Sequence, residues 1–535
     1  MKVTASLFLF IIICNLELCA QDRYVVFFTD KDNSPYSINS PSVFLSERSI
    51  QRRQRQGISI LANDIPVNET YIEGLKNSGI SVIHKSKWMN AVLTVMESSK
   101  VTEIERLTFV SKVDYVAPNG LPISTRSSDN VSSTRPLTIV ASTYQNNMLG
   151  INVMHEEGFK GQNMLVGVFD DGFQNISQLS PLQSLFNNDR LLLQKDFVTN
   201  STEIENTESH GTRVLSLLAS NEEGVFMGTA PEASYILCVT EAQGEYRVEE
   251  YNWLFAAEMA DSAGVDIIST SLGYSIFDDV QMNYAYADMD GETTVITQAA
   301  NMAASKGIAL VSSAGNEGGR SWNFITAPAD SESVLAVGAV DRGLDKASFS
   351  SFGPSSEGRI KPDVTALGQS TALINAFGDI VFQSGTSFSA PLVAGLATGL
   401  WQAFPKLTSF ELLDLIKQSA NQYNRPDVML GYGIPDFIRA YDIAFIPEPI
   451  ENTVLIYPNP VVDGLVNLVF ADGVLNEDLE LSLVNKNGQE LQRFRISPQE
   501  DDNRIRLDIS NQKHGIYILR IRGERTNFNR KIIKY

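Results

Sequence analysis

Apolar runs and helical stretches alternate along the middle of the chain. Five short runs are continuously apolar, which is typical of parallel strands covered on both faces. They are LVGVF at 165–169, SYILCVT at 234–240, VDIISTSLG at 265–273, IALVSSA at 308–314 and VLAVGAV at 334–340. Between them, residues 247–264 and 282–307 read as helices. This alternation predicts an α/β fold in which a parallel sheet lies between two layers of helices.

The two ends of the chain follow other patterns. Residues 22–119 read as strand, helix, two strands, helix and strand, which is typical of a small α+β domain. A last helix is expected near 437–444, and residues 446–453 read as a linker. Beyond the linker, six or seven short strands predict an all-β sandwich, in which Asn487-Gly488 is a strong hairpin signal.

The first 20 residues predict an export signal. A lysine follows the initial methionine, the apolar run LFLFIIIC comes next, and the small residue Ala20 stands before the expected cut. The apolar run is far shorter than the roughly 20 residues that cross a membrane. Lipidation at Cys19 is the alternative, but the residues Leu16-Glu17-Leu18 before it match such a site poorly.

Composition narrows the class of protein. A chain of 535 residues is too long for one core, and typical domain sizes indicate about three units. The formal net charge of -21 argues against binding nucleic acid or an anionic membrane through bulk electrostatics. The basic run RRQRQ at 52–56 is therefore interpreted as the solvated face of a helix, not as a processing or nucleic-acid site.

Three cysteines are present, and two of them belong to the predicted signal. The third, Cys238, has no partner for an internal disulfide, so an exported form must rely on core packing, to which bound metal ions can add. Since Cys238 lies in an apolar strand, we interpret it as a small buried hydrophobic residue and not as a functional thiol.

One serine stands in a setting that suits nucleophilic attack. Ser387 lies in a Gly-Thr-Ser turn directly before a long run of small and apolar residues that reads as a buried helix. In the first turn of a helix, unpaired N–H groups and the positive end of the helix dipole favour an anion at the hydroxyl. A short motif of this kind also occurs in turns that only cap a core helix. Its interpretation depends on the other groups that a nucleophile needs.

A serine nucleophile requires a base, a carboxylate that orients the base, and a donor for the oxyanion. Among the histidines, His210 alone stands in a suggestive place, before Gly-Thr and an apolar helix. Asp170 closes the strand at 165–169, at the end where open α/β sheets bind ligands. Asn316 follows the strand at 308–314 and is the candidate oxyanion donor, although Asn is also common in plain turns.

Five ordered motifs resemble the motif set of the subtilisin-like serine proteases. They are VGVFDDGF at 166–173, SHGTRV at 209–214, STSLGY at 269–274, SSAGNEGG at 312–319 and SGTSFSAPLVAG at 384–395. The order Asp, His, Ser is also that of subtilisin. The resemblance implies that Asp170 orients the histidine, that His210 is the general base and acid, that Ser387 is the nucleophile and that Asn316 is the oxyanion donor. At position 171 the family more often has Thr or Ser. Asp171 is therefore a less favoured alternative to Asp170 for orienting the histidine.

The same resemblance implies how substrate and pro-region bind. Ser271, Leu272 and Gly273 form an edge that pairs with the substrate backbone as an added strand, and Ala314 and Gly315 line the other side. The α+β region ahead of the catalytic region resembles a pro-region that assists folding and blocks the cleft until it is removed.

The C-terminal region resembles a second known module. YPNPVVDG at 457–464, GIYILRI at 515–521 and KIIKY at 531–535 are similar to the C-terminal sorting domain of proteins exported by the Bacteroidetes type IX system. A carbohydrate-binding or adhesive sandwich is the alternative, because a fold alone does not fix a function.

The expected organisation has five parts, taken in chain order. They are a signal peptide at 1–20, a pro-region at 21–119, a polar linker at 120–141 in which maturation cuts, a subtilisin-like peptidase domain at 142–445 and a β-sandwich sorting domain at 446–535.

The chemistry requires no cofactor, and the sequence assigns no metal ligands. Asp288, Asp290 and Glu292 place carboxylates two residues apart around a glycine, as calcium loops do, so structural calcium is possible. A solvated acidic turn is the alternative reading of these three residues.

These observations lead to the hypothesis of an exported serine endopeptidase, secreted or attached to the cell surface, that cleaves peptides or proteins through an acyl-enzyme. Its partners are its own pro-region as inhibitor and the type IX machinery, with no nucleic acid and no transmembrane segment. The alternative is a catalytically inactive subtilisin-like binding protein at the cell surface. Acyl transfer to an acceptor other than water also fits these residues.

Overall fold

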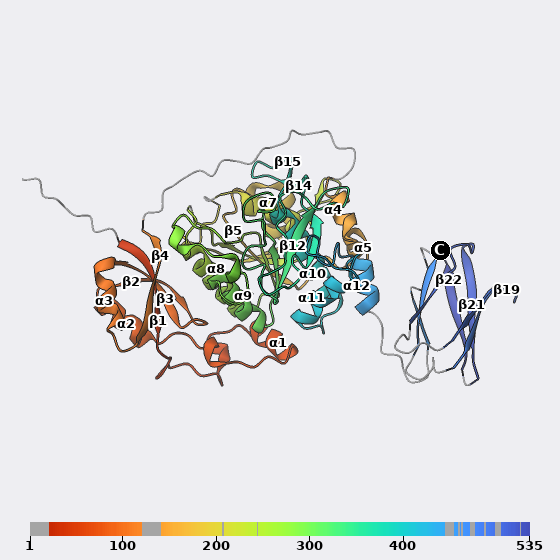
Figure 1. The fold of residues 1–535 in the computed structure, drawn as a ribbon, viewed down its shortest axis with the longest axis horizontal. Coiled ribbons are helices and arrows are strands. Elements are labelled where there is room, and N and C mark those ends of the chain that lie inside the picture. Colours follow the sequence, from red (N-terminus) through yellow and green to blue (C-terminus); the bar gives the residue numbers. More distant parts are fainter. Residues whose placement is uncertain are drawn as a thin grey trace, which may run out of the picture. The chain divides into compact units, whose positions relative to one another are not determined.

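The computed structural model describes residues 21–119, 141–205, 208–242 and 244–444, and residues 454–534 apart from 458, 460, 462–463, 471–476, 486–487, 498–503 and 525. Contacts divide the chain into two compact units, Met1–Pro435 and Asp436–Tyr535 (Figure 1). The expected signal peptide, almost all of the linker after the pro-region and the segment 446–453 lie outside the described residues.

A seven-stranded parallel sheet forms the centre of the first unit, with strand order β13-β12-β11-β10-β5-β9-β6. Its strands are β5 (Leu165–Asp170), β6 (Leu191–Asp196), β9 (Ser234–Val239), β10 (Ile267–Thr270), β11 (Ala309–Ser313), β12 (Val334–Val340) and β13 (Val364–Leu367). The five strands expected from continuous apolar runs are confirmed. The two edge strands were not predicted from continuous apolar runs, because β6 is only partly buried and β13 has four residues.

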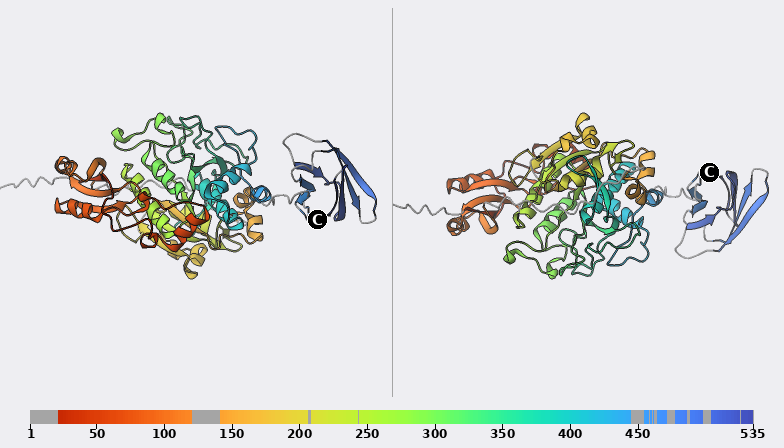
Figure 2. Two further views of the ribbon diagram at one scale, coloured as in Figure 1. Left: turned by 90° about the horizontal axis from the view of Figure 1, so that it is seen from below. Right: turned by 90° about the horizontal axis from the view of Figure 1, so that it is seen from above.

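Helices cover both faces of this sheet (Figures 1 and 2). α8 packs against α9 on one face, and α10 packs against α7 and contacts four strands, β10 to β13. The helices of this region are α4 (Thr143–Met148), α5 (Ile151–Glu156), α6 (Gln183–Asn187), α7 (His210–Ala219), α8 (Val248–Ala263), α9 (Val295–Ser305), α10 (Thr386–Ala403) and α11 (Ser409–Gln418). Two small hairpins complete it, β7 (Asn221–Glu222) with β8 (Phe226–Met227) and β14 (Thr371–Ile374) with β15 (Ile380–Gln383). The three-layer α/β architecture is confirmed.

The long helix α10 is buried from Thr386 to Trp401, as its apolar sequence predicts. Two glycines let it approach its neighbours closely. A Cβ atom at Gly395 would lie 1.8 Å from Thr229 Oγ1, and one at Gly399 would lie 2.2 Å from Met154 Sδ. Side chains at these positions would push the helix out of its place.

The N-terminal region is an α+β domain, as expected. Its antiparallel sheet has the order β2-β3-β1-β4, with β1 (Gln21–Phe28), β2 (Ser81–Ser86), β3 (Ala91–Glu97) and β4 (Val110–Pro118). Its helices are α1 (Glu47–Arg55), α2 (Glu69–Asn77) and α3 (Val101–Glu105). The sequence pattern does not anticipate α2, which begins at the cap Asn68, whose side chain accepts a hydrogen bond from Thr70 N–H.

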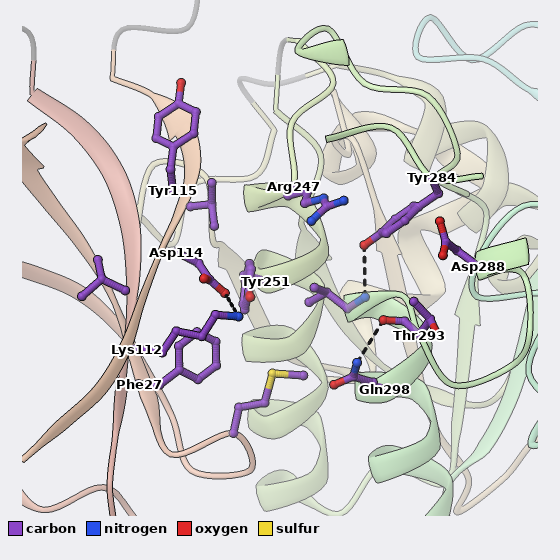
Figure 3. Close-up of a pocket in the computed structure, with 14 residues that line it drawn as sticks. Phe27, Lys112, Asp114, Tyr115, Arg247, Tyr251, Tyr284, Asp288, Thr293 and Gln298 are labelled. Atoms are coloured by element: carbon purple, nitrogen blue, oxygen red, sulfur yellow. Dashed lines mark hydrogen bonds and ion pairs between the residues drawn. The ribbon is translucent and has the colours of Figure 1, made fainter. Parts of the chain in front are cut away.

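This domain contacts the region of the parallel sheet around a cavity of about 520 Å³. Figure 3 shows Phe27, Lys112 and Tyr115 on its N-terminal side and Arg247 and Tyr251 on the opposite side. The Phe27 and Tyr251 rings meet edge to face, with centroids 6.5 Å apart. Packing between the two regions is therefore direct but incomplete at this point.

The basic run at 52–56 contradicts the interpretation as a solvated helix face. Arg52 and Arg53, in α1, are each 1% exposed. Both bind Asp261 of α8, with Arg52 Nη2 2.6 Å and Arg53 Nη1 2.9 Å from Asp261 Oδ1. Arg55, by contrast, has a side chain that is 42% exposed. The helix buries two of its four arginines where the N-terminal domain meets the region around the parallel sheet.

Further charges complete this buried ion cluster. Asp64 lies 2.8 Å from Arg53 and 3.2 Å from Lys306, and Lys87 Nζ lies 3.2 Å from Asp261 Oδ2. Burial alone raises the pKa of Asp261, but the charges of Lys87, Arg52 and Arg53 outweigh it and hold that pKa well below its usual range. Because every charge has a partner of opposite sign, the cluster tolerates removal from water.

The second unit begins with α12 (Phe437–Ala444), which confirms the expected last helix. Two antiparallel sheets follow, with the orders β16-β17-β20 and β19-β18-β21-β22. The strands are β16 (Val454–Tyr457), β17 (Leu465–Phe470), β18 (Leu479–Asn485), β19 (Glu490–Ile496), β20 (Arg504–Asp508), β21 (Gly515–Arg522) and β22 (Asn527–Lys534). They enclose one apolar core and form the predicted all-β domain. Strands β18 and β19 pair at the hairpin expected there, although Asn487 itself is not among the described residues.

The ion cluster generates a testable prediction. Replacing Arg53 with Ala removes one of the cations that neutralise Asp261 and Asp64, and we expect this to cost about 3–5 kcal/mol of unfolding free energy. Arg55→Ala is the matched control on the same helix. The Arg55 side chain is 42% exposed and lies 3.6 Å from Asp266, which also binds Arg48, so its loss should cost about 1 kcal/mol or less. Urea unfolding of the uncleaved chain, followed by tryptophan fluorescence, measures both. Equal small losses would contradict the burial of Arg53.

Candidate active site

Four side chains from separate parts of the chain meet at the carboxyl ends of the parallel strands. Asp170 is the last residue of β5, His210 is the first of α7, Asn316 follows β11, and Ser387 lies in the first turn of α10. All four line one cleft of about 430 Å³. The full lining is Asp170, Asp171, Glu208, His210, Arg213, Glu241, Glu245, Ser271, Leu272, Gly273, Ser313, Gly315, Asn316, Glu317, Arg320, Thr326 and Ser387.

Asp170 and His210 form a close pair. Asp170 Oδ1 lies 2.6 Å from His210 Nδ1 and also accepts a hydrogen bond from Asp171 N–H at 2.9 Å. The pair is close because Gly211 follows the histidine: a Cβ atom there would lie 2.4 Å from the Gly172 carbonyl oxygen. With Nδ1 directed at the carboxylate, Nε2 is the ring nitrogen left for the cleft.

The electrostatics of the pair favour a basic imidazole. Burial lowers the pKa of His210, but the negative charge of Asp170 and its hydrogen bond outweigh burial, so the pKa lies above its usual value. The charge of Asp171 adds to this effect. The His210 side chain is 23% exposed, so it remains accessible from the cleft.

Asp171 has a different function from Asp170. Its Oδ1 accepts hydrogen bonds from the backbone N–H groups of His210 and Gly211, at 3.1 and 3.3 Å. Burial and the adjacent charge of Asp170 raise the pKa of Asp171 to about 7. The carboxylate at 171 therefore holds the start of α7, whereas the carboxylate at 170 holds the imidazole.

Ser387 lies at the buried start of α10. Its hydroxyl donates to the carbonyl oxygen of Ser271 at 3.2 Å, and the Ser271 hydroxyl donates back to the Ser387 carbonyl oxygen at 2.9 Å. The rings of His210 and Phe388, the residue after the serine, lie 5.6 Å apart between centroids. These contacts fix α10 against both β10 and the histidine.

The amide of Asn316 is oriented by the turn that carries the serine. Its Oδ1 accepts hydrogen bonds from Thr386 N–H at 2.9 Å and from Thr386 Oγ1 at 3.0 Å. Because the backbone N–H can only donate, the oxygen of the amide must face it, and Nδ2 takes the other direction. Asn316 Nδ2 and the N–H of Ser387 are thus the candidate donors for an oxyanion in this cleft.

Two backbone segments flank the serine. Ser271, Leu272 and Gly273 line one side of the cleft and Gly315 lines the other. Ala314 is fully buried, and its backbone groups bind Val337 and Thr326, so it supports this side from behind. Gly315 has a φ of +105°, a conformation that side chains disfavour, and this allows the sharp turn after β11.

The cleft carries more negative than positive groups. Six carboxylates and two arginines line it. Arg320 pairs with Glu317 at 3.1 Å, and Arg213 donates to the Gln383 side chain at 2.9 Å.

Sequence reasoning correctly sets aside two other histidines. His84 Nε2 lies 2.8 Å from the Phe197 carbonyl oxygen and His155 Nε2 lies 3.1 Å from the Thr229 carbonyl oxygen, both away from the cleft. Cys238 is fully buried, and burial raises the pKa of its thiol far above the usual value, as expected of an inert core residue.

Sequence reasoning missed Thr386 and Thr326. Thr386 is the middle residue of the quoted Gly-Thr-Ser turn, so its place beside the serine was a usable signal. Thr326 lies ten residues after Asn316 in a loop, and no pattern in the sequence marks it.

The carboxylates of Asp288, Asp290 and Glu292 do not converge on one point. Asp290 accepts hydrogen bonds from Glu292 N–H and Thr293 N–H, each at 2.8 Å, and Asp288 accepts one from Ala285 N–H at 2.7 Å. Within the part of the chain that the structure describes, the one group of three metal-binding side chains is Asp170, Asp171 and His210. The hydrogen bonds of that group are those described above, and among the described residues Asp288, Asp290 and Glu292 do not form a second group of this kind.

Comparison with known proteins identifies the family. The model of the subtilase family matches residues 161–433, just over half of the chain. The chain therefore belongs to the subtilase family. Residues 23–133 match the peptidase S8 propeptide domain of Bacteroidota, and residues 455–535 match the secretion system C-terminal sorting domain.

Relatives and solved structures agree with this assignment. Subtilisin DY of Bacillus licheniformis is 30% identical over 269 residues, which are 49% of this chain and 86% of the relative. Subtilisin E of Bacillus subtilis is 27% identical over 354 residues, which are 65% of this chain and 79% of the relative. A crystal structure of the epidermin leader peptide processing serine protease of Staphylococcus aureus has the same fold. It has a TM-score of 0.56 at 15% identity, and the match covers 79% of this chain and all of that one.

The protein is accordingly a serine-type peptidase with a propeptide domain. Its sorting domain implies export by type IX secretion to the cell surface or beyond. None of the helices among the described residues is long and apolar enough to cross a membrane.

The contacts of Asp171 generate a prediction about pH. Asp171→Asn keeps an oxygen for the two backbone donors but removes a negative charge that stabilises the imidazolium, so we expect the pKa of His210 to fall. The downfield Nδ1–H proton signal, followed by NMR over a pH series, reports this pKa. Glu317→Gln, at the other side of the cleft, is the control and should leave the His210 titration in place. An unchanged or higher pKa in Asp171→Asn would contradict the assigned coupling.

Proposed function

We propose that this protein is a secreted serine endopeptidase in which Asp170, His210 and Ser387 form the catalytic triad. The observation that carries the proposal is the 2.6 Å contact of Asp170 with His210 Nδ1 in the cleft that also holds Ser387 and Asn316. The family membership supports the reaction class, and these side chains supply each group that the reaction requires.

The first half of the reaction forms an acyl-enzyme. The Ser387 hydroxyl, which rests on the Ser271 carbonyl oxygen, turns toward His210 Nε2 and attacks the peptide carbonyl carbon as the imidazole takes its proton. Asp170 stabilises the imidazolium that forms. His210 then gives this proton to the leaving nitrogen, the C–N bond breaks, and the amine product departs.

The second half returns the enzyme to its starting state. His210 removes a proton from a water molecule, whose oxygen attacks the ester carbon, and then returns the proton to Ser387 as the acid product leaves. In both halves the oxyanion is held by Asn316 Nδ2 and the Ser387 N–H. A single donor of this kind typically contributes about 10²–10³ in rate.

The walls of the cleft suit an extended peptide. Ser271, Leu272 and Gly273 follow strand β10, and we assign to them the pairing with substrate backbone as an added strand. Gly315, with Ala314 behind it, forms the opposite wall. No cofactor takes part in these steps.

We assign the parts of the chain as a signal peptide at 1–20, a pro-region at 21–119, a linker at 120–141 that maturation cuts, a peptidase domain at 142–445 and a sorting domain at 446–535. The pro-region acts as inhibitor, and the ion cluster around Asp261 supports a firm attachment of it to the peptidase domain. The type IX machinery is the partner of the sorting domain.

A fluorophosphonate probe tests the proposed nucleophile. We expect one label per mature molecule, located at Ser387 by peptide mass spectrometry, and neither labelling nor casein hydrolysis by Ser387→Ala. The Ser387→Ala chain should also keep its pro-region, because the cut in the linker is self-catalysed. Absence of label from the mature wild-type protein would favour the alternative, a subtilisin-like surface binding protein. Maturation of Ser387→Ala without added protease would assign that cut to another enzyme.

Deletion of residues 450–535 tests the sorting function. We expect the truncated protein to cleave peptides like the full chain but to remain inside the cell envelope. Immunoblots of culture medium, cell surface and envelope fractions provide the measurement. Normal secretion of the truncated protein would contradict the assignment, and loss of secretion together with loss of peptidase activity in the envelope fraction would indicate misfolding.

A further inference from the structure

We infer that Thr326 closes the specificity slot of the cleft, so that the enzyme cleaves after residues with short side chains and favours those that hydrogen-bond. The inference rests on the proposed function and adds to it the class of substrate. Thr326 is a specificity-determining residue in this inference and takes no part in the chemical steps.

The position of the slot follows from the catalytic groups. The carbonyl under attack must lie beside the Ser387 hydroxyl with its oxygen toward Asn316 Nδ2. The side chain of the residue that bears this carbonyl then points between the two walls, Ser271–Gly273 and Ser313–Gly315, because both walls line the cleft next to Ser387. What lies between the walls therefore decides which side chains fit.

Thr326 lies between those walls. Its N–H donates to the Ala314 carbonyl oxygen at 3.2 Å, which ties it to one wall. The next residue, Ala327, exchanges two hydrogen bonds with Tyr274, at 2.9 and 3.1 Å, which ties the segment to the other wall. The backbone at 326–327 thus joins the two walls and holds the Thr326 side chain at their junction.

The distances from the wall glycines to Thr326 show how tightly its side chain fills this space. A Cβ atom at Gly273 would lie 2.1 Å from Thr326 Oγ1, and one at Gly315 would lie 2.8 Å from the same oxygen. The hydroxyl therefore occupies the space directly between the two glycines. A substrate side chain that enters the slot meets Thr326 after a short distance, and a large aromatic or aliphatic one does not fit.

The hydroxyl at this position also has no partner of its own. Thr326 is 4% exposed, and its Oγ1 has no hydrogen-bond partner among the described residues, although the residue lines the cleft. A buried hydroxyl without a partner costs free energy, and a substrate group that bonds to it recovers that cost. Serine and threonine side chains are short enough to reach it and carry both a donor and an acceptor.

Two variants separate the size of Thr326 from its polarity. Thr326→Ala removes both branches of the side chain and opens the slot. Thr326→Val keeps the shape and removes only the hydroxyl. Four chromogenic peptides that differ only in the residue before the cut, with Ala, Val, Thr or Phe there, report kcat/KM for each enzyme, and fluorophosphonate titration gives the concentration of folded active sites.

We expect the wild-type enzyme to prefer Ala over Phe by about tenfold or more, since pocket size typically discriminates by about 10–200-fold. It should also prefer Thr over the equally sized Val by about three- to tenfold, the value of one hydrogen bond. Thr326→Ala should raise the Phe to Ala ratio about tenfold. Thr326→Val should leave Phe excluded and abolish the preference for Thr over Val.

The results that overturn the inference differ from those that overturn the proposed function. A wild-type enzyme that reacts with the probe but prefers Phe overturns the inference alone, as does a Thr326→Ala enzyme with an unchanged Phe to Ala ratio. A mature wild-type protein that neither reacts with the probe nor cleaves any of the four peptides overturns the proposed function, and the inference with it.

Discussion

The helix α10 is the constraint on which the active site depends. It is apolar around its whole circumference, so it is stable only inside the protein, and there it contacts strands β10 to β13. Because a buried helix leaves its first N–H groups without partners in the helix, its start must face polar groups or a ligand. Thr386 meets Asn316 in this way, and the next residue, Ser387, lines the cleft. Burial of one helix thus places the proposed nucleophile, Ser387, beside Asn316, the proposed oxyanion donor.

The attachment of the N-terminal domain follows a different principle. Buried charges of α1 make the contact with Asp261 of α8, which binds Arg52 and Arg53 together with Lys87, the residue after β2. Each ion is costly to bury alone and acceptable when paired. Such a contact is specific, because a surface without an anion at the position of Asp261 would leave Arg52 and Lys87 buried without a carboxylate. Removal of the N-terminal domain, as in the proposed maturation, would expose Asp261 to water.

Much of the fold could be predicted from the sequence, because strands buried on both faces are continuously apolar and the other sheets alternate in a regular way. β6 was beyond that reasoning, since Leu192 and Leu193 are exposed in an edge strand. The interpretation of Arg52 and Arg53 as solvated was wrong because burial of an arginine depends on its partner, and Asp261 lies more than two hundred residues later in the chain. No local pattern records a contact of that kind.

In the candidate site, too, some residues could be predicted from the sequence and others could not. Spacing and motifs pointed to Asp170, His210, Asn316 and Ser387, and the structure brings all four to one cleft. The motif position favoured Asp170 over Asp171, and the structure agrees, because Asp170 binds the imidazole whereas Asp171 binds the backbone at the start of α7. Thr326 lies in an irregular loop, where the side chain's surroundings are set by the walls that the loop joins.

The single cysteine outside the first 20 residues has a consequence for the environment in which the protein works. Cys238 lies inside β9, fully buried, and residues 21–535 contain no second sulfhydryl with which it could form a bridge. No oxidative step is needed to complete the fold of those residues, and no thiol reductant can undo it. The stability of the exported protein should therefore be indifferent to the redox potential outside the cell, in oxygenated and in anoxic surroundings alike.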